Sequence, residues 1–134
     1  MRRMALTGGA IVALFLLGAS GAFSSSAWAG PWEDGMAAYN RGDYVPAIRL
    51  FRPLAEQGNP KAQSVIGAMY RKGQGVAKSS VRALMWFSLA AKRGDAKAKA
   101  EVHEVSRDMT QAELSQARAM MQSCEASDYR NCEY

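Results

Sequence analysis

The chain has 134 residues, of which 22% are charged, and a formal net charge of +5 at pH 7. Arg2 and Arg3 supply two of these positive charges, which leaves +3 for the rest, where basic and acidic residues are interleaved. A basic stripe with aromatic residues, of the kind that holds nucleic acid, is not visible, so no nucleic-acid partner is expected. A chain of this length is enough for one small domain.

The beginning of the chain has the three parts of a secretory signal. Two arginines are followed by a charge-free apolar stretch over residues 10–17, and then by a segment of small residues that ends in Ala27-Trp28-Ala29. Small side chains at Ala27 and Ala29 suit the narrow pockets of a signal peptidase. The pattern predicts an exported protein, either periplasmic or secreted.

The predicted cleavage site lies between Ala29 and Gly30, which makes residues 1–29 the signal peptide and 30–134 the mature domain. The alternative is an uncleaved membrane anchor, because residues 4–32 carry no charge and a bilayer is spanned by about 20 helical residues. Contact with a membrane is expected only through this segment, if it is not removed.

The predicted mature chain contains an internal sequence repeat, and such a repeat determines the type of fold. Two residues of the first copy, Tyr39 and Gly42, recur 31 positions later, and five further residues recur at a shift of 36. The five are Ala47, Phe51, Ala55, Gly58 and Ala62, which return as Ala83, Phe87, Ala91, Gly94 and Ala98. Each copy reads as two helices.

In the first copy, residues 32–41 have the pattern of a helix that Gly42 ends. Asp43 is then predicted to cap a second helix, which carries Ala47, Leu50, Phe51 and Leu54 at helical spacing. Pro53 lies inside this second helix and removes a hydrogen bond at a cost of ~3 kcal/mol. We expect a kink at Pro53 rather than a break.

The second copy begins where Gly58 supplies a left-handed helix end and Asn59-Pro60 supplies a cap and a first-turn proline. A helix over Lys61–Lys72 follows. After the glycine-containing turn at residues 73–77, Ser80 is predicted to cap a helix that runs to Gly94.

In the third copy, Asp95 is predicted to cap one helix. The run Thr110-Gln111-Ala112-Glu113 predicts a capping box that opens the next helix. Six helices therefore fit in the mature chain.

Two runs of the second copy resemble a Sel1-like repeat. The runs are Ala62-Gln63-x-x-Ile66-Gly67-x-Met69-Tyr70-x-x-Gly73-x-Gly75-Val76 and Ala83-Leu84-x-Trp86-Phe87-x-Leu89-Ala90-Ala91-x-x-Gly94-Asp95-Ala96. The first copy, with Tyr39-Asn40-Arg41-Gly42-Asp43-Tyr44 and Ala47-Ile48, is closer to the related tetratricopeptide pattern.

This resemblance implies an all-α fold, a short right-handed α-solenoid of about three helix pairs. The repeats would cover residues 31–58, 60–94 and 96–127, followed by a C-terminal tail. Aromatic residues at helical spacing usually pack in the core, so Tyr70, Trp86 and Phe87 are expected there rather than at a ligand.

Both cysteines, Cys124 and Cys132, lie near the C-terminus, and an even pair in an exported chain indicates a disulfide, with two free thiols as the alternative. Residues eight apart in a helix are separated by about 12 Å of rise, beyond the roughly 7 Å limit for a bridge, so the chain must turn between them. Aligning Cys124 with Ala91 places Asp128 on Asp95. The spacing resembles that of secreted cysteine-rich Sel1-like proteins, and the bridge would tether the tail.

Little in the sequence indicates catalysis. His103 is the one histidine, and its spacing to Glu104 and Asp108 could bring an imidazole near a carboxylate, but the expected role is that of an exposed or capping residue. No Cys/His cluster predicts a metal, and no cofactor is expected. Some cysteine-rich relatives are linked to penicillin-type compounds, so the enzymatic alternative is a penicillin-binding or β-lactamase-type protein, although no Ser-x-x-Lys motif is present.

Solenoids bind proteins or peptides on an extended face of stacked helices. The resemblance therefore implies an adaptor or regulator with a protein or peptide partner in the cell envelope, and the sequence assigns no partner-binding residues. The remaining alternative is a structural subunit of an envelope complex or a homo-oligomer. An apolar face on the last helix would favour that alternative, and its residues are Ala112, Leu114, Ala117 and Met121.

Overall fold

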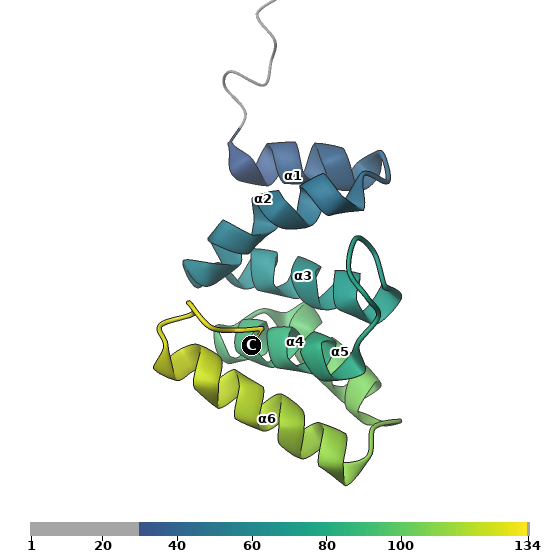
Figure 1. Cartoon of the computed structure of the whole chain (residues 1–134), viewed down its shortest axis with the longest axis vertical. Helices are drawn as coiled ribbons and strands as arrows, with labels where there is room; N and C mark the ends of the chain where they lie inside the picture. The colour runs from purple at the N-terminus through teal and green to yellow at the C-terminus, as the bar shows by residue number, and fades with distance from the viewer. Residues whose placement is uncertain (1–29, 134) are drawn as a thin grey trace, which may run out of the picture.

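The computed structural model describes residues 30–133, and the regular structure within this range is entirely helical. The helices are α1 (Pro31–Asn40), α2 (Tyr44–Glu56), α3 (Pro60–Lys72), α4 (Ser80–Lys92), α5 (Ala96–Ser106) and α6 (Gln111–Ala126). They are stacked in chain order along the long axis of the molecule (Figure 1). The predicted all-α solenoid is therefore confirmed, whereas the predicted signal peptide lies outside the described residues.

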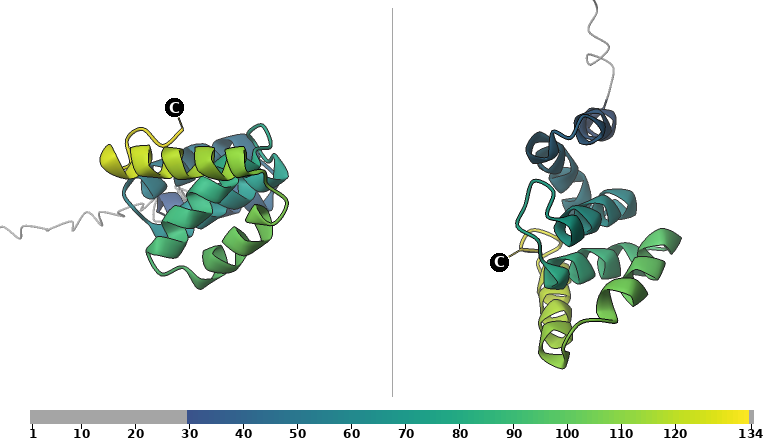
Figure 2. Two further views of the ribbon diagram at one scale, coloured as in Figure 1. Left: turned by 90° about the horizontal axis from the view of Figure 1, so that it is seen from below. Right: turned by 90° about the vertical axis from the view of Figure 1, so that its right-hand side faces the viewer.

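Each of the first four helices packs against the next one along the chain. The last helix differs, because α5 and α6 both pack chiefly on α4 and lie on either side of it (Figure 2). The third pair is therefore more open than the first two. Between residues 30 and 133, no helix has both the length and the apolar content that crossing a membrane requires.

Two glycines let aromatic rings enter the core in the same way in successive repeats. A Cβ atom on Gly35 in α1 would lie 2.7 Å from the ring of Phe51 in α2. A Cβ atom on Gly67 in α3 would lie 2.9 Å from the ring of Phe87 in α4. Both phenylalanines are at most 1% exposed, so each helix pair is closed by a ring lying directly on the backbone of its first helix.

Three helices end in the same left-handed turn, at Gly42, Gly58 and Gly94, with φ angles of 81°, 85° and 94°. In each turn, the glycine N–H and the next N–H donate to carbonyls near the end of the helix, which satisfies groups the helix leaves unpaired. The end of α6 repeats this pattern with Asp128 in place of glycine, at φ 55°.

This pattern corrects the predicted alignment of the C-terminal turn by one residue. The N–H of Asp95 donates to the carbonyl of Ala90, and the N–H of Tyr129 donates to the carbonyl of Cys124. Cys124 therefore corresponds to Ala90 rather than Ala91, and Asp128 corresponds to Gly94. The turn falls where it was expected, but on a residue with a side chain.

Two predicted caps are wrong in detail. Asp43 precedes α2, but its side chain makes no cap bond and pairs with Arg41 Nε at 3.1 Å instead. Pro46, the third residue of α2, has no N–H, which removes one of the two donors that a cap side chain can use. In α4 the cap is Ser79 rather than Ser80, because the extended backbone at Ser79 lets its Oγ accept from the N–H of Arg82 at 3.1 Å.

The other local predictions are confirmed. Asn59 caps α3 with Pro60 in its first turn, and Thr110 forms the reciprocal capping box with Glu113. Helix α2 continues through Pro53 to Glu56, so the proline does not break it, whereas the kink at Pro53 stays a prediction.

We predict different costs for the same substitution at two equivalent aspartates. Asp95 Oδ1 accepts the N–H of Ala98 at 2.8 Å, so Asp95→Ala should lower the free energy of unfolding by about 1 kcal/mol. Asp43→Ala removes no cap bond and only a surface ion pair, and should cost about 0.5 kcal/mol or less. Urea denaturation followed by circular dichroism measures both, and equal losses would contradict the assignment of the caps.

Candidate functional site

A groove of about 220 Å³ lies on the side of the molecule formed by the first helix of each pair, α1, α3 and α5. We call it the first-helix groove. Its floor is apolar and contains Met36 from α1, Val65 and Ala68 from α3, and Phe87 from α4. Phe87 is buried, but Met36, Val65 and Ala68 are only partly buried, so the floor is accessible from solvent.

The rim of this groove is mainly basic. Arg71 and Lys72 come from the last turn of α3, and Lys97 comes from α5. Arg71 forms an ion pair with Glu101, whereas Lys72 and Lys97 are exposed and make no ion pair with the described residues. The rim therefore keeps uncompensated positive charge.

A second hollow of about 190 Å³ continues the groove towards the start of the domain. It shares Ser64, Val65 and Lys97 with the first and adds Trp32, Lys61 and Asp95. Trp32 lies against Phe51, with ring centroids 5.3 Å apart, which fixes the indole at the end of the groove. The two hollows together form one surface with apolar side chains along it and lysines beside them.

The turn between α3 and α4 closes the other end of the groove. The Tyr39 hydroxyl donates to Gln74 Oε1 at 3.0 Å, and the N–H of Ser79 donates to the carbonyl of Tyr70 at 2.9 Å. These bonds attach the turn to α1 and to the end of α3. The groove is therefore bounded by fixed elements.

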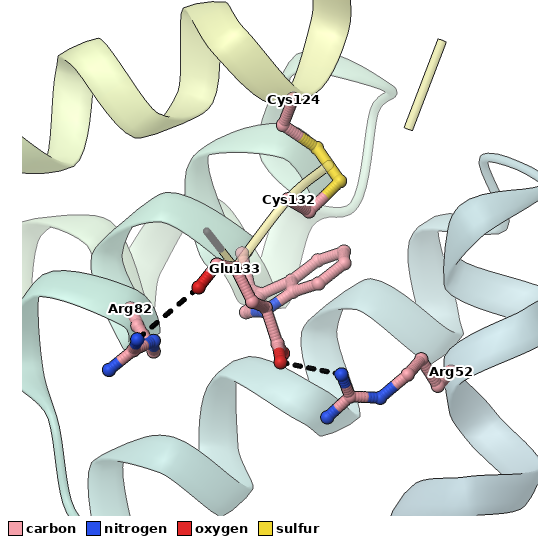
Figure 3. Close-up of polar contacts among 6 residues, drawn as sticks. Arg52, Arg82, Cys124, Cys132 and Glu133 are labelled. Carbon is pink, nitrogen blue, oxygen red and sulfur yellow. Dashed lines mark hydrogen bonds and ion pairs between the residues drawn. A yellow bond between two sulfur atoms is a disulfide. The ribbon is translucent and has the colours of Figure 1, made fainter. Parts of the chain in front are cut away.

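A second cluster lies at the C-terminal tail, on the second helices α2 and α4 (Figure 3). After α6, a disulfide joins Cys124 to Cys132, with their Cα atoms 4.2 Å apart. The next residue, Glu133, lies between Arg52 of α2 and Arg82 of α4. Arg52 Nη1 is 2.6 Å from Glu133 Oε2, Trp86 Nε1 donates to Oε1 at 3.3 Å, and Arg82 Nη2 donates to the Glu133 carbonyl at 3.3 Å.

This cluster is largely shielded from water, since the side chain of Glu133 is 11% exposed and that of Arg52 is 34% exposed. Burial, together with a hydrogen bond to Glu133, raises the pKa of Tyr70 from its usual 10 to about 12. Burial alone would lower the pKa of Arg52, but the Glu133 carboxylate and Tyr70 raise it above its ordinary value overall. Tyr70 therefore stays neutral and Arg52 stays charged at neutral pH.

The Tyr70 pKa predicts a loss of stability at high pH. Because the folded pKa is higher than the unfolded one, folding favours the protonated phenol. This contribution is complete below about pH 10 and is lost as the pH rises through about 12. We expect the free energy of unfolding to fall less in Tyr70→Phe than in the unmodified chain between about pH 9 and 11.5. Urea titrations of both chains at the two pH values measure this difference. Equal losses in the two chains would contradict the raised pKa of Tyr70.

The residues with predicted roles are distributed as follows. Tyr70, Trp86 and Phe87 are buried in the core, as predicted, although the polar atoms of Tyr70 and Trp86 also reach Glu133. His103 is exposed on α5, and the nearby Glu104 accepts from Arg107 at 2.8 Å. Among the described residues, no group of three or more His, Cys, Asp or Glu side chains is arranged to hold a metal ion.

Sequence reasoning missed the tail cluster altogether. Arg52 and Glu133 are 81 positions apart, and neither belongs to a motif. The one available signal was the pair of cysteines, which indicated that the tail turns back but gave no indication of where it lands.

The apolar face predicted on the last helix is partly covered. Ala117 is buried, Leu114 and Met121 are partly buried, and Ala112 is exposed. A cleft of about 240 Å³ remains between α4, α5 and α6, lined in part by Leu84 and Val102. The open third pair leaves this cleft because α6 lies against α4.

Comparison with known families gives a match to the Sel1 repeat over residues 35–59 and 60–95. The two matched ranges coincide with the pairs α1–α2 and α3–α4. Sel1 repeats generally mediate protein–protein interaction, and the family is typically non-catalytic. The glycine turns, the buried aromatic pairs and this match lead to one conclusion: the chain is a Sel1-like repeat protein, with two Sel1 repeats between residues 35 and 95.

Proposed function

We propose that this protein is an exported adaptor or regulator that binds a protein or peptide partner in the first-helix groove. The observation that carries the proposal is the composition of that groove, in which an accessible apolar floor is bordered by exposed lysines. The partner segment would bury one or two apolar side chains on the floor and place acidic residues near the rim.

The energetics of such a contact favour the floor for affinity and the rim for specificity. Apolar area removed from water contributes roughly 25 cal/mol per Å², so Met36, Tyr39 and Val65 supply affinity. Exposed charges contribute less, but they orient the partner and raise the association rate. The bonds that fix the groove in advance reduce the ordering cost of binding.

A pair of charge-matched variants tests the groove. Lys72→Glu with Lys97→Glu reverses two rim charges, whereas Arg49→Glu with Lys99→Glu reverses two exposed charges that do not line the groove. The mature chain, residues 30–134, is crosslinked in the envelope fraction of its own source, and captured proteins are quantified by mass spectrometry. We expect one reproducible partner, recovered at least tenfold less with the groove variant and equally with the control.

Two outcomes would overturn the proposal. Equal recovery of the partner with both variants would move binding to another surface, and the absence of a reproducible partner would remove the adaptor function. Circular dichroism of the variants shows whether the fold is retained, and all four exchanged residues are solvent-exposed.

Export is the second part of the proposal. It is supported by the three-part signal pattern and by the cysteine pair, since disulfides persist in oxidising compartments outside the cytoplasm. Intact-mass spectrometry of the native protein should give a chain that begins at Gly30. A mass that includes residues 1–29 would contradict cleavage and favour a membrane anchor.

A further inference from the structure

The cluster around Glu133 has the composition of a binding site for a carboxylate. Arg52, Arg82 and Trp86 offer only hydrogen-bond donors, and the hydroxyl of the neighbouring Tyr70 is kept protonated. The four residues come from α2, α3 and α4, and none of them lines the first-helix groove. This cluster is thus a second site, independent of the function proposed above.

The ligand of this site is a residue of the chain's own tail. Glu133 is the last residue that the structure describes, and it enters the cluster from the end of the chain (Figure 3). Arg52 and Trp86 donate to the two oxygens of the Glu133 carboxylate, and Arg82 donates to the main-chain carbonyl of the same residue. A hollow of about 130 Å³ adjoins the carboxylate and is lined by Arg52, Glu56, Trp86 and Cys132, so there is a path along which another chain can approach.

Two features keep the tail in place. The disulfide closes a loop from Cys124 to Cys132, immediately before Glu133. Arg93, at the end of α4, holds Tyr129 of this loop. Its Nη2 donates to the Tyr129 hydroxyl at 2.7 Å, and its guanidinium lies over the ring, 4.8 Å from the centroid. Such a short tether presents Glu133 at an effective concentration in the millimolar range, which excludes a competing carboxylate in solution.

The loop is also held in an unfavourable backbone conformation. Asp128 and Tyr129 are consecutive residues with positive φ angles, 55° and 63°, and neither is glycine. A residue with a side chain is unfavourable in this conformation and persists there only when its surroundings enforce it. Opening the loop would relieve this cost and favour departure of the tail.

We propose that Arg52, Tyr70, Arg82 and Trp86 form a carboxylate-binding site, in which Glu133 is a resident ligand that can be exchanged for a glutamate on an extended segment of a protein partner. Exchange follows reduction of the disulfide by a dithiol. The S–S bond breaks, Cys124 and Cys132 each gain a proton and an electron, and the dithiol is oxidised to its own disulfide. Reduction releases the tail, and the site accepts the partner's side chain.

The test uses the full chain carrying Glu133→Ala, reduced with dithiothreitol, so that the resident carboxylate is absent. The probe is a fluorescein-labelled, amidated peptide, Ser-Asp-Tyr-Arg-Asn-Ser-Glu-Tyr, which copies residues 127–134 with serine for cysteine. Its matched control has glutamine in place of glutamate. Fluorescence anisotropy should show at least tenfold tighter binding of the glutamate peptide, and adding Arg52→Gln should abolish this preference. The oxidised, unmodified chain should bind neither peptide.

Three results would overturn the inference: equal binding of the two peptides, a preference that survives Arg52→Gln, or strong binding to the oxidised unmodified chain. Should Glu133→Ala lose its helical circular dichroism, the same titration on the reduced unmodified chain replaces it. There the peptide competes with the chain's own tail, so binding is weaker but the preference for glutamate must remain.

Discussion

Trp86→Ala is expected to lower the free energy of unfolding by about 4 kcal/mol, a large part of the total stability of a small domain. Trp86 is 1% exposed and heads the fully buried side chains of the core by volume. Its loss leaves a cavity at the centre of α4, which packs against α3, α5 and α6. It also removes the indole N–H that donates to Glu133. Urea denaturation monitored by circular dichroism measures the loss.

Two further variants separate volume from hydrogen bonding. Trp86→Phe keeps most of the ring and removes the N–H, and should cost about 1–2 kcal/mol. Trp32→Ala removes a partly buried indole at the groove and should cost less than Trp86→Ala, about 2 kcal/mol. A loss of about 1 kcal/mol or less for Trp86→Ala would show that α4 does not form the centre of the core.

Gly75→Ala should lower the free energy of unfolding by about 3 kcal/mol, because two costs combine at this position. Gly75 has a φ of +71°, where an L-residue with a side chain is strained by about 1–2 kcal/mol. An added Cβ would also lie 2.7 Å from the carbonyl carbon and oxygen of Tyr44. Those atoms are backbone at the start of α2, so they cannot move without shifting the helix.

Gly42→Ala is the matched control for this prediction. Gly42 has a similar φ of +81°, but an added Cβ would have no atom within 4 Å. The control should therefore lose only the conformational part, about 1 kcal/mol. Equal losses in the two variants, measured by urea denaturation, would show that the turn after α3 does not lie against α2.

The contact between Gly75 and Tyr44 also explains a feature of the repeat. The turn at residues 73–79 is longer than the turn between α1 and α2, and it returns to contact the first repeat. Gly75 is required for close approach to the backbone of α2 as well as for turning. The turn therefore connects adjacent repeats and fixes the end of the first-helix groove.

Local sequence determined the helices and most of their ends. Hydrophobic spacing gave six helices, and Asn59, Asp95 and Thr110 cap them as their chemistry requires. These predictions succeed because each depends on atoms within a few residues. The cap predicted at Asp43 was wrong, and Pro46 removes one of the two N–H groups that such a cap could have used.

Only the tertiary structure decided how the third pair and the tail are placed. Helix α6 packs on α4 instead of closing against α5, and the ion pair between Lys92 and Glu125 joins α4 to α6. Glu133 meets Arg52 of α2 and Trp86 of α4 because the tail turns back from the end of α6 onto the second helices of the first two pairs. The sequence separation of two such residues does not predict whether they meet. Their distance in space depends on the packing angles of all the helices that lie between them in the chain. The sequence by itself therefore determined the repeat and its caps, whereas the groove, the cleft and the carboxylate cluster arise from the way the helices stack.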